Sequence, residues 1–248
     1  MSEENKKIDL GGHTVRTRTL GAGDRTFVLL HGFADGMDVW NAVAADLAAR
    51  GRVVLVEQRG HGYTAGPAGP YEWDDLGREL VSVLAELGVA RAVLVGHGLG
   101  GIVALLTALE APERVEKLVL IGTATEADAE QETWCREIRK AGKWNAMQGI
   151  SHAIFGPTSR KQVDGIPGPL VELAKRMETL SAEPITSRMT AVSCPALVLR
   201  GENDPARSES LAQALPGATA ETLAGHGHFP HKKDPAAVAA AILKFAGS

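Results

Sequence analysis

A histidine and an aspartate near the C-terminus have the residue types and surroundings of an acid–base pair. Asp204 ends the turn that begins at Gly201, directly after an apolar run, and His228 stands in the loop from Ala224 to His231. A carboxylate bonded to one imidazole nitrogen fixes the tautomer and leaves the other nitrogen available to take a proton. If the fold brought the two side chains together, Asp204 could orient His228 as a general base, but taken alone neither residue favours that role. Each residue also has a plainer explanation, as a turn-capping aspartate and as a loop histidine.

A third candidate is the stretch from Ala92 to Ala104. Its apolar, β-branched first half stops at a group of glycines, and an apolar helical pattern follows at once. This pattern predicts a buried strand that turns sharply into a helix. Gly98 stands at the turn, and because it has no side chain it cannot attack a substrate.

The same glycines could form a dinucleotide-binding fingerprint, in which Gly96, Gly98 and Gly101 are the spaced glycines. That fingerprint belongs on the first strand of a sheet, and an acidic residue should close the next strand about 20 residues later. The next apolar run instead ends in Gly122-Thr123-Ala124. The dinucleotide interpretation is therefore disfavoured.

These residues must be positioned by a sheet, because apolar runs alternate with helical patterns along the chain. Alternation of this kind predicts parallel β–α–β units. Expected strands cover 26–30, 52–56, the run from 92, 116–121, 194–200 and 218–223, after an antiparallel pair at 7–10 and 13–20. Expected helices cover 37–50, 73–87, the stretch after Gly98, 208–215 and 235–246.

The alternation stops in the middle of the chain. Residues 126–189 contain no strand-like run, and their helical stretches are broken by Gly and Pro. We expect a helical cap at 126–189, inserted into a core domain made of 1–125 and 190–248. Apolar cap residues could line a small pocket, and about half of them would instead form the cap's own core; they are Trp134, Ile138, Trp144, Met147, Ile150 and Phe155.

Taken together, the strand-end motifs resemble those of the α/β-hydrolase superfamily. Gly96 to Gly100 is similar to its nucleophile elbow, Gly-x-Ser-x-Gly, with glycine in place of the nucleophilic serine. Four other segments match the family's motifs. His31-Gly32-Phe33 matches the oxyanion loop, and residues 59–62 match the Arg-Gly-His-Gly turn, with Glu57 where aspartate is usual. Residues 201–204 match the acid turn, and residues 228–235 match the histidine loop. The order of nucleophile position, acid and histidine is also the family's. Within the superfamily, residues 71–123 look most like the enol-lactonase and small-esterase branch.

The resemblance implies a mostly parallel eight-stranded sheet flanked by helices, with a helical cap. It implies a catalytic set of Gly98, as the nucleophile position, with Asp204 and His228. Backbone N–H groups of Phe33 and Leu99 would form the oxyanion hole. Substrate would also meet His31, Gly32 and His97, together with Trp134, Trp144, Met147 and Phe155 of the cap.

Strand-end histidines and the arginine turn have a structural interpretation as well. We expect His31, His61 and His97 to form hydrogen bonds within their loops rather than to act as catalysts. Arg59 is expected to hold its loop through an ion pair.

The sequence thus predicts an enzyme that acts on a small ester, lactone or related carbonyl substrate. Gly98 would mark either an engineered inactive form or a natural variant. One alternative is a decarboxylase, lyase or cyclase that uses His228 and Asp204 as a general base. Another is a binding protein that has lost its chemistry, although a pure binder would need neither residue.

Composition excludes several other classes. The 248 residues are 44% apolar and 23% charged, which suits one globular domain with an insertion. A net charge of −4 without a basic block gives no reason to expect nucleic acid as a partner. No apolar run is long enough for a bilayer, and the polar N-terminus lacks the pattern of a signal peptide. With two cysteines, expected to be small buried residues, these features favour a cytoplasmic protein; the oligomeric state stays open.

Three histidines of the last loop raise the alternative of a metal site. His226, His228 and His231 have a spacing similar to the His-x-His-x-Asp-His motif of metallo-β-lactamases, but Pro230 stands where the acid would be. No other ligand cluster supports that motif. We therefore expect neither a metal nor a cofactor.

Overall fold

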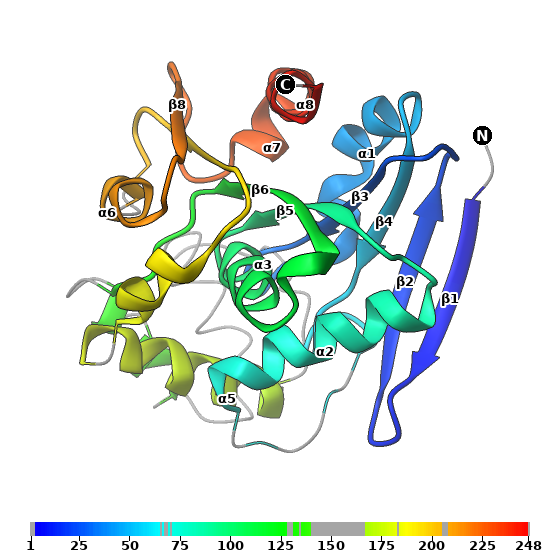
Figure 1. Cartoon of the computed structure of the whole chain (residues 1–248). Coiled ribbons are helices and arrows are strands. Elements are labelled where there is room, and N and C mark those ends of the chain that lie inside the picture. Colours follow the sequence, from blue (N-terminus) through cyan, green and yellow to red (C-terminus); the bar gives the residue numbers. More distant parts are fainter. Residues whose placement is uncertain are drawn as a thin grey trace.

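The computed structural model describes residues 3–64, 66, 69, 71–127, 131–133, 135–139, 167–182, 184–204 and 208–247. Its centre is an eight-stranded sheet with the strand order β1-β2-β4-β3-β5-β6-β7-β8 (Figure 1). The strands are β1 (Glu3–Asp9), β2 (Thr14–Leu20), β3 (Thr26–Leu30), β4 (Arg52–Val56), β5 (Ala92–His97), β6 (Val115–Ile121), β7 (Ala196–Gly201) and β8 (Thr219–Leu223).

The sheet is antiparallel at one edge and parallel elsewhere. β1 pairs with β2 and β2 with β4 in antiparallel fashion, while every pair from β4 to β8 is parallel. This confirms the mostly parallel, eight-stranded sheet predicted from the sequence. Parallel strands place their carboxyl ends at one edge, where ligands bind in sheets of this type. The loops after β3, β5, β7 and β8 therefore meet there.

Helices cover both faces of the sheet. In Figure 1, α2 (Trp73–Glu86) and α3 (Leu99–Glu110) lie on one face, and α1 (Asn41–Ala48) and α8 (Pro235–Gly247) lie on the other. Other helices with described bounds are α5 (Pro167–Glu178), α6 (Ser208–Ala214) and α7 (Pro230–Lys233). The described 3-10 turns are Met37–Trp40, Pro112–Arg114, Thr179–Ser181 and Ile185–Ala191.

Burial explains why the strand sequences differ. All residues of β3 and β5 are buried, and both strands are continuous apolar runs up to the carboxyl end, as expected for strands covered on both faces. β1 lies at the edge and is mostly exposed. It begins at Glu3, earlier than the sequence predicted, because an exposed edge strand needs hydrogen bonds to β2 but no apolar side chains.

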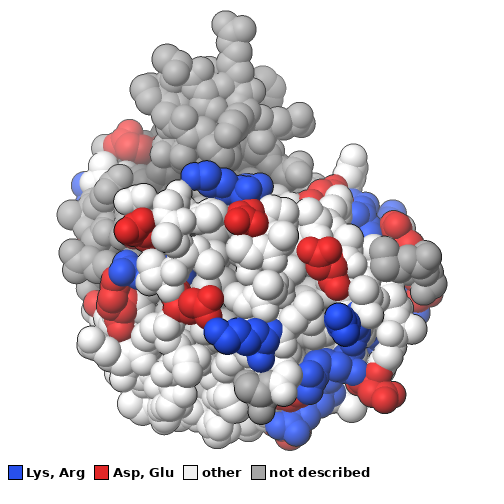
Figure 2. All heavy atoms as spheres, turned by 90° about the horizontal axis from the view of Figure 1, so that it is seen from above, with Lys and Arg blue, Asp and Glu red and all other residues white. Residues whose placement is uncertain are grey.

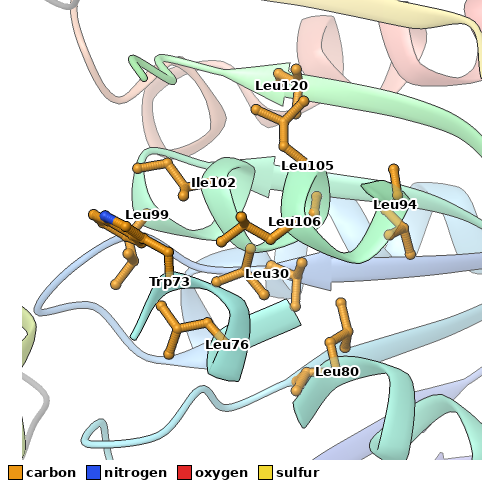
Figure 3. Close-up of a cluster of buried hydrophobic side chains, with 14 of the residues drawn as sticks. Leu30, Trp73, Leu76, Leu80, Leu94, Leu99, Ile102, Leu105, Leu106 and Leu120 are labelled. Carbon is orange, nitrogen blue, oxygen red and sulfur yellow. The ribbon is translucent and has the colours of Figure 1, made fainter. Parts of the chain in front are cut away.

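The core on one face is built around α3, which packs against the sheet and against α2 (Figure 3). Leu105 of α3 points toward Leu120 of β6, whereas Leu99 lies against Trp73 of α2. All four side chains are at most 3% exposed. This packing fixes the start of α3, and therefore the turn at Gly98, relative to the sheet.

The middle of the chain agrees with the expected helical character as far as it is described. Residues 131–133 and 135–139 are helical, α5 follows, and no strand occurs among the described residues of 126–189. Ile138 is fully buried. Trp134, Trp144, Met147, Ile150 and Phe155 lie outside the described residues, so their assignment to the pocket stays a prediction, as do the cap boundaries.

The described helices, the surface charges and the two cysteines relate to the sequence predictions about a membrane segment, a basic block and buried thiols. Among the described helices, none combines the length and apolarity that crossing a membrane would require. Side chains of both charge signs are interspersed on the face seen in Figure 2. Cys135 and Cys194 are buried, unpaired thiols, and burial raises the pKa of Cys135 to about 12.

The contact between α2 and α3 gives a test of the packing. A Cβ at Gly77 would lie 2.9 Å from the backbone carbon of Leu106, whereas a Cβ at Gly12 would meet nothing within 4 Å. We expect Gly77→Ala to lower the free energy of unfolding by about 1–3 kcal/mol through overpacking. Gly12→Ala, the matched control, should change it by less than about 0.5 kcal/mol. Urea denaturation measures both, and equal stabilities would contradict the close helix contact.

Candidate active site

Asp204 and His228 meet at the carboxyl ends of the last two strands. Asp204 follows β7, His228 follows β8, and His228 Nδ1 lies 2.8 Å from Asp204 Oδ1. This is the contact predicted from the sequence. The carboxylate side chain is fully buried, while the imidazole is 33% exposed. A buried acceptor fixes Nδ1 as the protonated nitrogen, and the partly exposed ring can reach a substrate.

A glycine lets this pair pack against the end of β6. A Cβ at Gly122 would lie 3.0 Å from Asp204 Oδ2 and 3.1 Å from His228 Nδ1. Its φ of +53° also favours glycine. Sequence reasoning did not single out Gly122, because a glycine after a strand resembles an ordinary turn.

The turn between β5 and α3 has the backbone of a nucleophile elbow. Gly98 has φ +50° and ψ −114°, its N–H donates to Ile121 O at 2.9 Å, and its carbonyl accepts from Gly101 N at 3.0 Å. A Cβ at Gly96 or Gly100 would collide with backbone atoms. At Gly98 the nearest atom would be the Gly32 Cα, 4.0 Å away. The flanking glycines are therefore sterically required, whereas position 98 has room for a side chain.

Two backbone groups beside this turn are the candidates for the oxyanion hole. Leu99 is the first residue of α3, and the first N–H groups of a helix have no acceptor within the helix and carry its partial positive charge. Phe33 lies in the loop after β3, partly buried against the same core. Their joint action on an oxyanion stays a prediction.

His31 and His61 are held by the loops around them. His31 Nδ1 donates to Gly32 O at 2.9 Å, and its Nε2 accepts from Gln58 N at 3.0 Å. His61 Nδ1 donates to Arg59 O, and its Nε2 accepts from Ala34 N at 3.0 Å. Burial lowers the pKa of His31 well below its ordinary value and that of His61 to about 4. Both rings are therefore neutral, as the loop-bonding interpretation requires, and substrate contact by His31 stays a prediction.

His97 supports the backbone of the candidate base. Its Nε2 lies 2.9 Å from His228 O and donates to it, and the two rings are 4.7 Å apart. Burial holds the pKa of His97 well below its ordinary value, and it lowers the pKa of His231 to about 3. His97 thus positions His228, while its predicted contact with substrate remains untested.

Comparison with known proteins identifies the fold. A sequence profile of the alpha/beta hydrolase family matches residues 27–241. The chain belongs to that family. The enol-lactonase from Burkholderia xenovorans LB400 superposes with a TM-score of 0.88 at 22% identity, covering 98% of this chain and 100% of that one. A hydrolase from Pseudomonas aeruginosa PA01 superposes with a TM-score of 0.85 at 24% identity, covering 98% of each chain.

Curated relatives have several different names. A putative carbamate hydrolase RutD of Pantoea ananatis is 30% identical, over 86% of this chain and 85% of the relative. The 3-oxoadipate enol-lactonase 2 of Acinetobacter baylyi is 24% identical, over 79% and 78%. The dihydrolipoyllysine-residue acetyltransferase component of an acetoin cleaving system, from Pseudomonas putida, is 29% identical over 90% of this chain, and the match spans 64% of that protein's length.

Two ion pairs brace the loops of this hydrolase-family site. Arg59 Nε and a terminal nitrogen lie 2.9 and 2.7 Å from Glu79 Oε2, which confirms the expected ion pair. Lys232 Nζ lies 2.6 Å from Asp35 Oδ1 and joins the histidine loop to the oxyanion loop. Sequence reasoning missed this second pair, because the two residues are far apart in the chain and resemble ordinary turn residues.

The buried neutral histidines make stability depend on pH. Below about pH 6.5 the unfolded chain takes up protons that native His61 and His231 refuse until the pH reaches their lowered pKa values of about 4 and about 3. We expect the free energy of unfolding to fall by ~1.4 kcal/mol per pH unit for each of them as the pH drops from about 6.5 to the lowered pKa of that histidine. Urea titrations at several pH values measure this slope. His61→Gln should reduce it by one histidine's share, and a slope unchanged by that substitution would contradict the assignment.

Proposed function

We propose that the chain hydrolyses a small carboxylic ester or lactone with a water molecule that His228 activates above Gly98. The observation that carries this proposal is the Asp204–His228 hydrogen bond beside an elbow that has room but no nucleophile. A protein that only binds a ligand has no need of an oriented base. The names of the relatives, which include an enol-lactonase and a carbamate hydrolase, favour an acyl substrate.

The reaction follows from the roles of the groups. A water held in the space over Gly98 loses a proton to His228 Nε2 as its oxygen attacks the carbonyl carbon. The carbonyl oxygen becomes an oxyanion and accepts hydrogen bonds from the Phe33 and Leu99 N–H groups. The imidazolium, stabilised by Asp204, then gives its proton to the departing alkoxide as the C–O bond breaks. The products are a carboxylic acid and an alcohol, or one hydroxy acid from a lactone, without a covalent enzyme intermediate.

Glycine at position 98 would lower the reaction rate without removing the other catalytic groups. Loss of the nucleophile from a serine triad costs about 10⁶ in rate, and residual catalysis of 10³–10⁴ over water, approximately, comes from the oxyanion hole and binding. The proposed oxyanion donors are main-chain groups, so they do not depend on a side chain at 98. A well-placed water is thus the feature that would separate a working variant from an inactivated one.

A second candidate reaction uses the same base without hydrolysis. The room at Gly98 admits a substrate group as readily as a water, so His228 could instead remove a proton from the substrate in a decarboxylation, elimination or cyclisation. Products formed in H₂¹⁸O separate the two candidates, because hydrolysis places one ¹⁸O in the acid and the second candidate places none. Ligand binding without any turnover would favour a receptor.

Restoring the serine tests the elbow directly. In Gly98→Ser the hydroxyl would enter the open space, where His228 can deprotonate it. We expect ester or lactone hydrolysis to rise by several orders of magnitude, and a serine-directed phosphonate to label the variant but not the parent. The positive φ should cost the variant about 1–3 kcal/mol in stability. A folded Gly98→Ser protein that neither hydrolyses esters nor takes up the phosphonate would defeat the hydrolase interpretation.

Substitutions in the acid–base pair test the parent chain. His228→Ala should abolish turnover, and Asp204→Asn should lower kcat by about 10⁴, as loss of the orienting carboxylate does in serine hydrolysis. Turnover is measured on a panel of esters, lactones and β-keto acids, with circular dichroism as the control for folding. Glu202→Gln is the matched control and should keep full activity. Glu202 lies in the same turn as Asp204, and its carboxylate accepts a hydrogen bond from Gly225 N. Unchanged turnover in His228→Ala would remove the base from the mechanism.

A further inference from the structure

Three potential ligand residues gather in the interior behind His228. Asp35 comes from the loop after β3, His97 from the end of β5, and His231 from α7. One ligand atom from each lies within 4.8 Å of the others, and the residues are 8%, 2% and 1% exposed. His97 holds the His228 carbonyl and Asp35 pairs with Lys232, but these contacts do not explain why two imidazoles and a carboxylate converge in the interior.

The tautomer of His97 is fixed by its surroundings. Because Nε2 donates its proton to His228 O at 2.9 Å, Nδ1 of the neutral ring carries a lone pair. This buried Nδ1 has no hydrogen-bond partner within the described part of the chain. A metal-binding histidine typically has this arrangement, in which one nitrogen donates to a backbone carbonyl and the other presents its lone pair to the ion.

His231 is unsatisfied to a greater degree. Its ring packs between Trp40, at 4.6 Å, and His97, at 4.4 Å. Neither of its nitrogens has a hydrogen-bond partner among the described residues. Buried polar atoms left without a partner lower the stability of the fold. An ion that accepts lone pairs from both imidazoles would relieve that cost.

The access to His97 Nδ1 depends on a glycine. A Cβ at position 32 would lie 2.5 Å from Nδ1 and would cover the lone pair. With Gly32, the ring nitrogen stays uncovered on that side.

We propose that Asp35, His97 and His231 bind one divalent transition-metal ion of the zinc type. Two imidazole nitrogens and a carboxylate oxygen form a common ligand set for such ions, and a fourth position is open to water. Zinc–ligand distances of about 2.0–2.2 Å require ligand atoms about 3.3–3.5 Å apart. The separation of up to 4.8 Å therefore closes by small side-chain rotations when the ion binds.

Lys232 competes with the metal for the carboxylate. Its ammonium lies 2.6 Å from Asp35 Oδ1, and its side chain is 31% exposed and passes over the Phe229 ring at 4.5 Å. The ion must displace the ammonium, which can move into solvent. Movement of the Lys232 ammonium into solvent would open the way for the ion to reach Asp35, and the loss of the ion pair would weaken the net affinity for the metal.

The proposed ion would act on the position of the base rather than on substrate. It would join the elbow strand, through His97, to the helix that follows His228, through His231. Binding of the ion to the native state alone would also stabilise the fold. The inference does not depend on the hydrolysis proposed above, since its readouts are metal binding and stability.

Metal titration tests the site directly. The chain is stripped with a chelator and titrated with Zn²⁺ against a chromophoric chelator, and with Co²⁺ to record the visible absorption of a low-coordinate ion. We expect one ion per chain. Asp35→Asn and His231→Gln should each weaken binding by about tenfold or more, since even the loss of a residue that only supports a metal ligand has an effect of this size. Lys232→Met should tighten binding, because it removes the competing cation.

A histidine outside the cluster supplies the control for these titrations. His226→Gln changes a loop histidine outside it and should leave Zn²⁺ affinity unchanged. If His231→Gln does not fold, Asp35→Asn and Lys232→Met still test the site, because their predicted shifts have opposite signs. Absence of Zn²⁺ binding to the parent, or affinities that neither substitution moves, would overturn the proposal and leave a buried water as the occupant.

Discussion

The site depends on how closely two backbones approach at the turn between β5 and α3. Side chains at Gly96 and Gly100 would collide with neighbouring backbone, and one at Gly101 would run into Thr123. Only glycine at these positions lets α3 start directly over the carboxyl end of the sheet. That start sets the Leu99 N–H at the helix terminus and brings Gly98 beside the loop after β3. The packing of α3 against the sheet and against α2 then holds the turn in place (Figure 3).

Electrostatics divides the histidines of this region into two kinds. His31, His61, His97 and His231 are buried, and burial lowers their pKa values, so their rings are neutral. His228 is partly exposed and bonded to a buried carboxylate. Desolvation disfavours a charged imidazole in the first group. The candidate base is therefore set apart from them by its partial exposure and its carboxylate partner.

The residues of the candidate site come from separate elements. Asp204 and His228 follow β7 and β8, the oxyanion candidates belong to the loop after β3 and to α3, and none of them needs a side chain at position 98. Gly98 keeps the positive φ of an elbow without the strain that a larger residue would carry.

The sequence alone determined the sheet and the order of its motifs, because apolar runs and strand-end turns are local patterns and parallel strands collect their ends at one edge. The Asp204–His228 pair followed from the resemblance of those motifs to the α/β-hydrolase superfamily. The sequence also anticipated the Arg59 ion pair and the loop-bonded histidines. Tertiary structure decided what no local pattern contains: the edge strand at Glu3, the glycine at 122 beside the pair, the Lys232–Asp35 bridge, and the grouping of His231 with His97 rather than with its neighbours in the loop. Each of these joins residues distant in the chain, and such contacts are fixed only when the packed elements bring the loops together.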